Sequence, residues 1–179
     1  MIAIALSLLL AAGAAAEEPV SQTPAKAVAA AVRFTPPKGW TPDAYANAGG
    51  ADPVARYEKG SDAIVIRLFG GAGSDYATPA EFLAGPAASE EGAASVPAGT
   101  TTVAGRKVEL RRRRFPIEVA DPHRAGPTSK LKGAEVFLVL PLKGARFAVL
   151  AYRRETPIPD LHQAGEKAWA AFLKTVRPR

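Results

Sequence analysis

Hydrophobic and polar positions fall along most of the chain in short runs that are typical of β-strands. The runs 54–60 and 63–69 meet at a Gly-Ser-Asp turn, and this arrangement predicts a hairpin. Residues 63–69 are nearly all apolar, which predicts a central strand that is covered on both faces. The segment 134–155 contains two further apolar runs around Lys143 and Gly144, and it predicts the strongest hairpin of the chain.

Helical periodicity predicts elements that would cover such a sheet. Thr78, Pro79 and Glu81 have the spacing of a capping box with proline at the first helical position. The segment 159–179 carries apolar residues at helical spacing, which predicts a closing amphipathic helix. A short helical turn is expected within 41–50. The apolar stripe of the closing helix consists of Leu161, Ala164, Ala168, Trp169, Phe172, Leu173 and Val176.

The remaining segments complete the predicted fold. Residues 32–34 are expected to form a short strand, and residues 100–119 two strands joined by a glycine turn. The polar segments 88–100 and 120–133 are predicted to be loops. About seven strands in hairpin order with three helical segments predict an α+β fold. We expect a single antiparallel sheet of about six to seven strands, flanked by helices in an α/β/α sandwich.

The N-terminal residues have the pattern of a secretory signal peptide. An apolar run passes into small residues that end before Glu17, so residues 1–16 are predicted to be a signal peptide. The run is shorter than the ~20 apolar residues that span a membrane. It carries no Lys or Arg, and a single membrane anchor or a misassigned start codon are the alternatives. Residues 17–31, which contain two prolines, are predicted to be a flexible linker, and residues 32–179 a single α+β domain.

The composition limits the chemistry. The sequence contains no cysteine, which excludes a lipid anchor on cysteine, disulfides, thiolate zinc sites and a cysteine nucleophile. No segment after the N-terminal run is apolar over a length that would span a bilayer. The formal net charge of +6 is basic without being the mark of a nucleic-acid-binding protein. We therefore expect an exported protein, periplasmic or secreted, with no transmembrane segment in the mature chain.

Candidate catalytic residues are few. His123 lies in a polar segment beside Asp121, with Thr128 and Ser129 close in sequence, but no Gly-x-Ser-x-Gly motif accompanies them. We interpret His123 as a solvated loop residue, and His162 as exposed or packed at the edge of the closing helix. The carboxylates are scattered, and the glycine-rich segment after the second hairpin strand lacks the lysine of a phosphate-binding loop. The sequence therefore predicts no catalytic residue, no metal ligand and no cofactor.

Four consecutive arginines in the stretch "ELRRRRFPIE" carry the main binding prediction. Because side chains alternate along a strand, a run of four charges cannot be buried on either face of a sheet. One interpretation is a solvated strand at the edge of the sheet, where charges prevent sheet-to-sheet aggregation. The other is a basic patch that binds phosphate or carboxylate groups. The predicted patch consists of Arg111, Arg112, Arg113, Arg114, Arg124, Lys130 and Lys132.

The order of these segments resembles the PsbP/Mog-like fold, including the small exported DcrB-like bacterial proteins. The resemblance rests on stretches that together span roughly residues 32–177. They are "RFTPPKGW", "VARYEKGSDAIVIRLF", "VAGRKVELRRRRF", and "EVFLVLPLKGARFAVLAYR" with "AWAAFLKTVRP". Members of this group are mostly binding proteins with varied partners, so the resemblance implies a binding protein rather than an enzyme. No binding residue of the family maps onto this sequence, so the resemblance implies none.

These observations predict an exported, non-enzymatic binding protein of the cell envelope. The first expected role is that of a protein-interaction module, whose partner is another envelope protein. The alternative is a binder of an anionic envelope polymer, a glycan or lipid, through the arginine-rich strand and the segment that follows it. Nucleic acid is not expected as a partner, because an exported protein meets little of it and only Phe115 in the run could stack on a base.

Overall fold

The computed structural model describes residues 23–43, 52–86, 89–90, 93–120, 127–156 and 162–179. Its main element is a seven-stranded antiparallel sheet in which the strands are ordered β2-β3-β4-β10-β9-β8-β7. In that order they are β2 (Thr41–Pro42), β3 (Val54–Lys59), β4 (Asp62–Phe69), β10 (Phe147–Arg154), β9 (Pro127–Pro141), β8 (Arg106–Ala120) and β7 (Val96–Val103). Two small sheets pair β1 (Val32–Arg33) with β11 (Arg177–Pro178) and β5 (Ser89–Glu90) with β6 (Ala93–Ala94). The predicted α+β class and the antiparallel sheet are confirmed.

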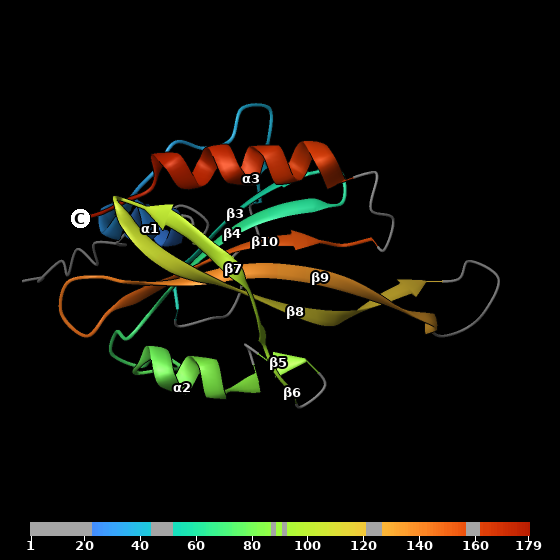
Figure 1. Ribbon diagram of the computed structural model, residues 1–179, viewed down its shortest axis with the longest axis horizontal. Helices are drawn as coiled ribbons and strands as arrows, with labels where there is room; N and C mark the ends of the chain where they lie inside the picture. Colours follow the sequence, from blue (N-terminus) through green and yellow to red (C-terminus); the bar gives the residue numbers. More distant parts are fainter. Residues whose placement is uncertain (1–22, 44–51, 87–88, 91–92, 121–126, 157–161) are drawn as a thin grey trace, which may run out of the picture.

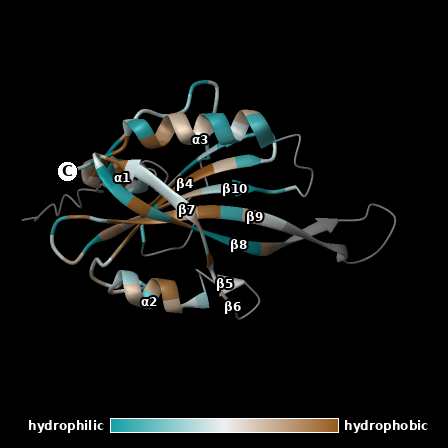
Figure 2. Cartoon of the chain, in the orientation of Figure 1, coloured by the Kyte–Doolittle hydropathy of each residue, from teal (hydrophilic) through white to brown (hydrophobic). Residues whose placement is uncertain are grey.

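Three helices lie against the two faces of the sheet (Figure 1). Helices α1 (Thr23–Ala31) and α3 (Gln163–Thr175) contribute to one apolar cluster on one face, which we call the α3 face. Helix α2 (Pro79–Ala84) contributes to a second apolar cluster on the opposite face, which we call the α2 face. The two clusters make β4 and its neighbours a middle layer, and hydrophobic residues gather in these strands between α3 and α2 (Figure 2).

Strand β4 shows how the sequence produces this layer. Its alternating residues Ile64 and Ile66 are fully buried on the α3 face, whereas Val65 and Phe69 are buried on the α2 face. A strand with apolar residues on both sides is stable only where both of its faces are covered. The prediction of a central, doubly covered strand over 63–69 is therefore confirmed.

Helix α2 begins where the capping pattern predicts. The Thr78 hydroxyl accepts a hydrogen bond from the backbone N–H of Glu81, and the Glu81 carboxylate accepts one from the N–H of Ala77 (2.9 Å). These contacts satisfy N–H groups that the first helical turn leaves without partners. The buried ring of Phe82 then anchors the helix on the sheet, where it contacts the aromatic rings of Phe69, Tyr76, Phe137 and Phe147.

Part of the predicted linker is wrong. Residues Thr23–Ala31, which we expected to be flexible, form helix α1, and Val28 of this helix is fully buried in the α3-face cluster. The segment is rich in alanine, which has the highest helix propensity, and Pro24 and Val28 are its buried residues. The rest of the predicted linker and the predicted signal peptide lie outside the described residues.

Two predicted loops also differ from the structure. Strand β7 begins at Val96, inside the segment 88–100, and strands β8 and β9 continue as a paired ribbon to Ala120 and from Pro127. The prediction of a loop over 120–133 rested on polar composition, but antiparallel strands tolerate polar side chains wherever a face is not covered. The expected helical turn in 41–50 is wrong at its start, where β2 pairs with β3; residues 44–50 lie outside the described part.

Candidate binding site

The four consecutive arginines of β8 are divided between the two faces of the sheet. Arg111 lies opposite Phe137, which belongs to the α2-face cluster, so Arg111 and Arg113 project on the α2 face. Arg112 and Arg114 project on the α3 face and are exposed. The run is therefore not one continuous patch, and its two halves meet different surroundings.

Strand β8 is an interior strand for the first half of this run. It pairs with β9 on one side and with β7 on the other as far as Arg112, which lies opposite Val96. At Arg113 and Arg114, strand β7 has ended, and within the described residues the ladder continues on the β9 side alone. The interpretation of a strand at the sheet edge thus fits the second half of the run and not the first.

The arginines of the α2 face donate hydrogen bonds to, and form ion pairs with, other groups of the protein. Arg111 Nε donates to the hydroxyl of Ser95 (2.8 Å), and its guanidinium also contacts the carbonyl of Ser95 and the carboxylate of Glu109. Arg56, on the same face, forms ion pairs with Asp43, Glu58 and Glu155. Burial is the largest influence on Arg56 and lowers its pKa, but the hydrogen bonds to the two glutamates outweigh it and leave the pKa raised.

Glu135 is the centre of this arrangement. It is 2% exposed and lies opposite Arg113 on β8 and Arg153 on β10, at 3.0 Å and 3.4 Å from their guanidinium nitrogens. The Arg153 guanidinium also stacks 4.2 Å over the ring of Phe115. Burial lowers the pKa of Arg153 and of Arg67, and the charge of Glu135 partly opposes this in both. One buried carboxylate therefore pairs with two arginines, Arg113 and Arg153, and these arginines contribute to the fold.

The other members of the predicted patch are not assembled by the described structure. Arg124 lies outside the described residues. Lys130 and Lys132 lie in strand β9, where their backbones pair with those of Glu118 and Pro116, but their side chains are not described. The predicted patch stays a prediction at these positions. Of the predicted patch, the structure describes Arg111 and Arg113, which pair with acidic residues on the α2 face. It also describes Arg112 and Arg114, which are exposed on the α3 face.

His162 differs from the interpretation drawn from sequence. It is 1% exposed, with Nδ1 2.6 Å from Asp62 Oδ1 and Nε2 3.1 Å from the carbonyl oxygen of Thr156. The Tyr152 hydroxyl donates to the same Asp62 oxygen (2.9 Å), and burial followed by this hydrogen bond raises the pKa of Tyr152. Gly165 packs so closely that a Cβ there would lie 2.2 Å from Asp62 Oδ2. We call Asp62, Tyr152 and His162 the buried network; it attaches the start of α3 to the sheet.

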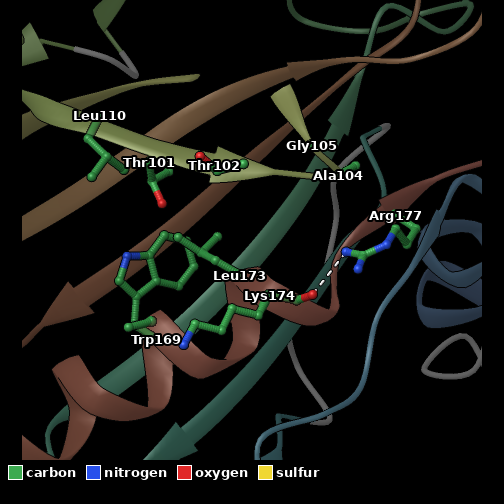
Figure 3. A pocket seen from close by; sticks show the side chains of 10 residues that line it. Thr101, Thr102, Ala104, Gly105, Leu110, Trp169, Leu173, Lys174 and Arg177 are labelled. Carbon is green, nitrogen blue, oxygen red and sulfur yellow. Dashed lines mark hydrogen bonds between the residues drawn. The ribbon is translucent and has the colours of Figure 1, made fainter. Parts of the chain in front are cut away.

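A pocket opens between α3 and the end of the β7–β8 hairpin (Figure 3). Its volume is about 500 Å³, and we call it the Trp169 pocket. The helix supplies an aromatic and aliphatic wall, and the strands supply the hydroxyl of Thr101 and the side chain of Leu110 (Figure 3). The residues that line it are Thr101, Thr102, Ala104, Gly105, Leu110, Trp169, Ala170, Leu173, Lys174 and Arg177.

A second pocket of about 430 Å³ adjoins the first at Ala104 and Arg177. Half of its lining is cationic, and the residues that line it are Ala104, Arg106, Pro141, Leu142, Lys143, Arg177, Pro178 and Arg179. The cations of the two pockets together are Arg106, Lys143, Lys174, Arg177 and Arg179, which we call the basic end. All five are exposed, none forms an ion pair with an acid in the described part of the chain, and no acidic residue lines either pocket.

Local structure explains how residues so far apart in sequence meet. The turn between β7 and β8 has positive φ at both Ala104 (51°) and Gly105 (78°), the conformation of a tight hairpin turn, and it places Arg106 at the rim. Lys143 lies in the β9–β10 turn. Arg177 follows α3, and its guanidinium donates to the carbonyls of Lys174 and Val176 at the negative end of the helix.

The sequence offers little signal for this site. Its five cations are not neighbours in the sequence, and they form a surface only because the fold brings two turns and the end of a helix together. The four arginines of β8, in contrast, are adjacent in the sequence and easily noticed. A signal for this site in the sequence is the pair of cations at the end of the closing helix, Lys174 and Arg177.

No known family model matches the chain, and no curated protein matches it. Within the described residues, no group of three or more His, Cys, Asp or Glu side chains is arranged to hold a metal ion. None of the helices described is both long and apolar enough to cross a membrane.

Proposed function

We propose that this protein is an exported, non-enzymatic binding protein of the cell envelope that docks a negatively charged partner on its basic end. The observation that carries the proposal is the pair of adjoining pockets with five exposed cations and no acidic residue in their lining. The arginine run, for which a solvated edge strand and a basic patch are the two interpretations, is the other candidate surface. Acidic residues within the fold already pair with Arg111 and Arg113 of that run, which leaves the basic end as the stronger candidate.

Physical arguments support an acidic partner. Cations of one sign around a hollow reinforce one another, and their field attracts an approaching anion and raises its rate of association. Arginine forks suit carboxylate and phosphate groups, and lysine adds a mobile point charge. The first candidate partner is an acidic surface on another envelope protein, and the alternative is an anionic glycan or lipid.

The buried network supports the non-enzymatic part of the proposal. Histidine beside aspartate is a common catalytic pair, but His162 and Asp62 lie beneath α3 with 1% and 7% of their surface exposed. A general base must reach the proton that it removes, either directly or through one water. The hydrogen bonds of this pair are instead made with Tyr152 and Thr156, which suits a structural attachment.

The order of hairpins followed by a closing helix also supports the resemblance to PsbP/Mog-like proteins, and we propose that the helices and sheet form a sandwich of that kind. Helices on both faces of one antiparallel sheet are in keeping with it. An experimental structure compared with members of that group would test the proposal, and a different strand order there would contradict it.

The docking proposal is tested by charge reversal with a matched control. The purified protein is titrated with poly-L-glutamate and with envelope extract at several salt concentrations. We expect the affinity to fall with salt, and to fall about tenfold in Lys143→Glu/Arg179→Glu, because each reversal removes an attraction and adds a repulsion of roughly 0.4 kcal/mol. The control variant Lys59→Glu/Lys167→Glu changes the net charge equally, at exposed positions outside the two pockets.

Two results would contradict the proposal. One is binding that does not depend on salt, and the other is an equal loss of affinity in both variants, which would show a response to net charge alone. A parallel titration with phosphatidylglycerol vesicles separates the candidate partners. Binding to vesicles but not to polyglutamate or to envelope proteins would favour the lipid alternative.

A further inference from the structure

The Trp169 pocket has the size and lining of a site for a small molecule. Its volume of about 500 Å³ falls within the range of ligand pockets, which are mostly apolar with a few polar groups that orient the ligand. Here Leu110, Trp169 and Leu173 supply apolar surface from two different elements, and the hydroxyl of Thr101 in β7 faces them (Figure 3). Trp169 is only 7% exposed, so its ring is fixed as a wall of the pocket.

The indole N–H of Trp169 is a donor that the described fold does not use. It makes no hydrogen bond with any described residue, and it is not among the fully buried side-chain atoms that lack a partner. The nitrogen is therefore not completely buried. An indole nitrogen can donate but cannot accept a hydrogen bond, so it suits an oxygen atom of a ligand.

The two cations of this pocket lie on different sides of it: the Lys174 amine reaches back along α3 toward Trp169, and the Arg177 guanidinium lies on the other side (Figure 3). Lys174 extends from the last turn of α3, and Arg177 follows the helix (Figure 3). Arg177 Nη1 donates to the backbone carbonyls of Lys174 and Val176, which fixes the guanidinium at the mouth of the pocket. A guanidinium that is already oriented loses less conformational entropy when it pairs with an anion, and its other nitrogens remain for that pairing.

We propose that the Trp169 pocket binds a small amphiphilic carboxylate. Its apolar body lies against Leu110, Trp169 and Leu173, and its carboxylate pairs with Arg177, while Lys174 adds positive charge on the other side of the pocket. A hydrophobic wall alone would accept any apolar molecule, whereas two cations and no acid in the lining select a negative head group. A free carboxylate fits better than a lipid held in a bilayer, because the pocket lies between a helix and a hairpin and has the volume of a small ligand.

Fluorescence of Trp169 provides the test. The chain has two tryptophans, and Trp40→Phe leaves Trp169 as the single reporter. This protein is titrated with octanoate, with 1-octanol, which lacks the charge, and with acetate, which lacks the apolar chain. We expect a saturable change with octanoate, at least tenfold weaker binding of octanol, and no change with acetate over the same range. Equal affinities for octanoate and octanol, or a response that never saturates, would overturn the proposal.

Matched variants locate the binding. Ala170 lines the pocket and Ala171 does not, although both are exposed on α3. We expect Ala170→Phe to abolish octanoate binding and Ala171→Phe to retain it, with the circular dichroism of both unchanged. Lys174→Gln should weaken octanoate binding severalfold and leave octanol binding unaltered, whereas Lys167→Gln should change neither. Retained octanoate binding in Ala170→Phe would overturn the proposal.

Binding of a carboxylate in the Trp169 pocket is a different property from docking on the basic end, and separate variants test the two. Lys143 and Arg179 do not line the Trp169 pocket, so Lys143→Glu/Arg179→Glu should still bind octanoate. Ala170→Phe should in turn still bind polyglutamate, because it leaves the five cations in place. Loss of both activities in both variants would contradict separate sites.

Discussion

Two groups of cations on this molecule differ in how their charge is balanced. On the α2 face, Arg113 and Arg153 flank Glu135, and all three side chains are less than a fifth exposed. At the basic end, five cations are exposed and are not ion-paired within the described chain. The first group is removed from water and must be neutralised inside the protein, whereas the second keeps its hydration and its field extends outward.

Charges that are neutralised inside the protein are therefore assigned to stability, and charges that face solvent without a partner are assigned to binding. A conspicuous run of arginines in the sequence supplies structural ion pairs on one of its faces. Cations scattered through the sequence form the surface that faces solvent without internal partners. Breaking a balanced group should therefore cost stability, and breaking the exposed group should leave stability almost unchanged. Substitutions in each group test this contrast.

The largest effect is expected at Glu135. Replacing Glu135 by Gln leaves Arg113 and Arg153 close together without their shared anion, so the free energy of unfolding should fall by about 3 kcal/mol. Urea unfolding followed by circular dichroism measures this change. The matched control is Glu166→Gln, because Glu166 also pairs with an arginine, Arg154, but is 56% exposed. Its effect should stay below about 1 kcal/mol, and equal losses at the two sites would contradict the contrast.

Helix α3 joins a buried region and an exposed one, because its start packs on the buried network and its last turn carries Lys174 of the basic end. Replacing glycine by alanine inside a helix usually stabilises it by up to about 1 kcal/mol. At Gly165 we expect the opposite, a loss of about 2 kcal/mol, because the new Cβ would lie 2.2 Å from Asp62 Oδ2 and 2.4 Å from the Tyr152 hydroxyl. Thermal and urea unfolding measure the loss. Removing the hydroxyl with Tyr152→Phe should recover part of it, and a stabilised Gly165→Ala protein would contradict the packing described.

Much of the fold could be predicted from local patterns. The hairpin of β3 and β4, the doubly covered β4 and the cap at Thr78 all follow from residues that are neighbours in sequence. The burial of His162 could not be predicted in this way, because it depends on a hydrogen bond to Asp62, one hundred residues earlier in the chain. The basic end was missed for the same reason. Sequence patterns show charges that are adjacent along the chain, and they do not show which charges the topology brings together or neutralises.

A smaller effect is expected from alkaline pH through Tyr152. Burial and the hydrogen bond to Asp62 raise its pKa in the folded protein above the value near 10 of an unfolded tyrosine. The stabilisation by neutral Tyr152 is therefore complete below about pH 10 and is lost as the pH rises through the folded pKa. Between pH 8 and pH 11 the wild-type free energy of unfolding should fall by about 1 kcal/mol more than that of Tyr152→Phe. Parallel pH profiles, measured by urea unfolding, would show that Tyr152 does not couple folding to protons.

The smallest effect on stability is expected where the effect on binding is expected to be largest. Lys143 and Arg179 are exposed and form no ion pair within the described residues, so Lys143→Ala/Arg179→Ala should change the free energy of unfolding by no more than about 0.5 kcal/mol. Mutual repulsion among the five cations is screened by salt, so the wild-type protein should gain more stability than this variant when salt is added. Urea unfolding at low and high salt measures both quantities. A loss comparable with that of Glu135→Gln would make the basic end a structural feature, and the unpaired cations would then need an internal partner to explain them.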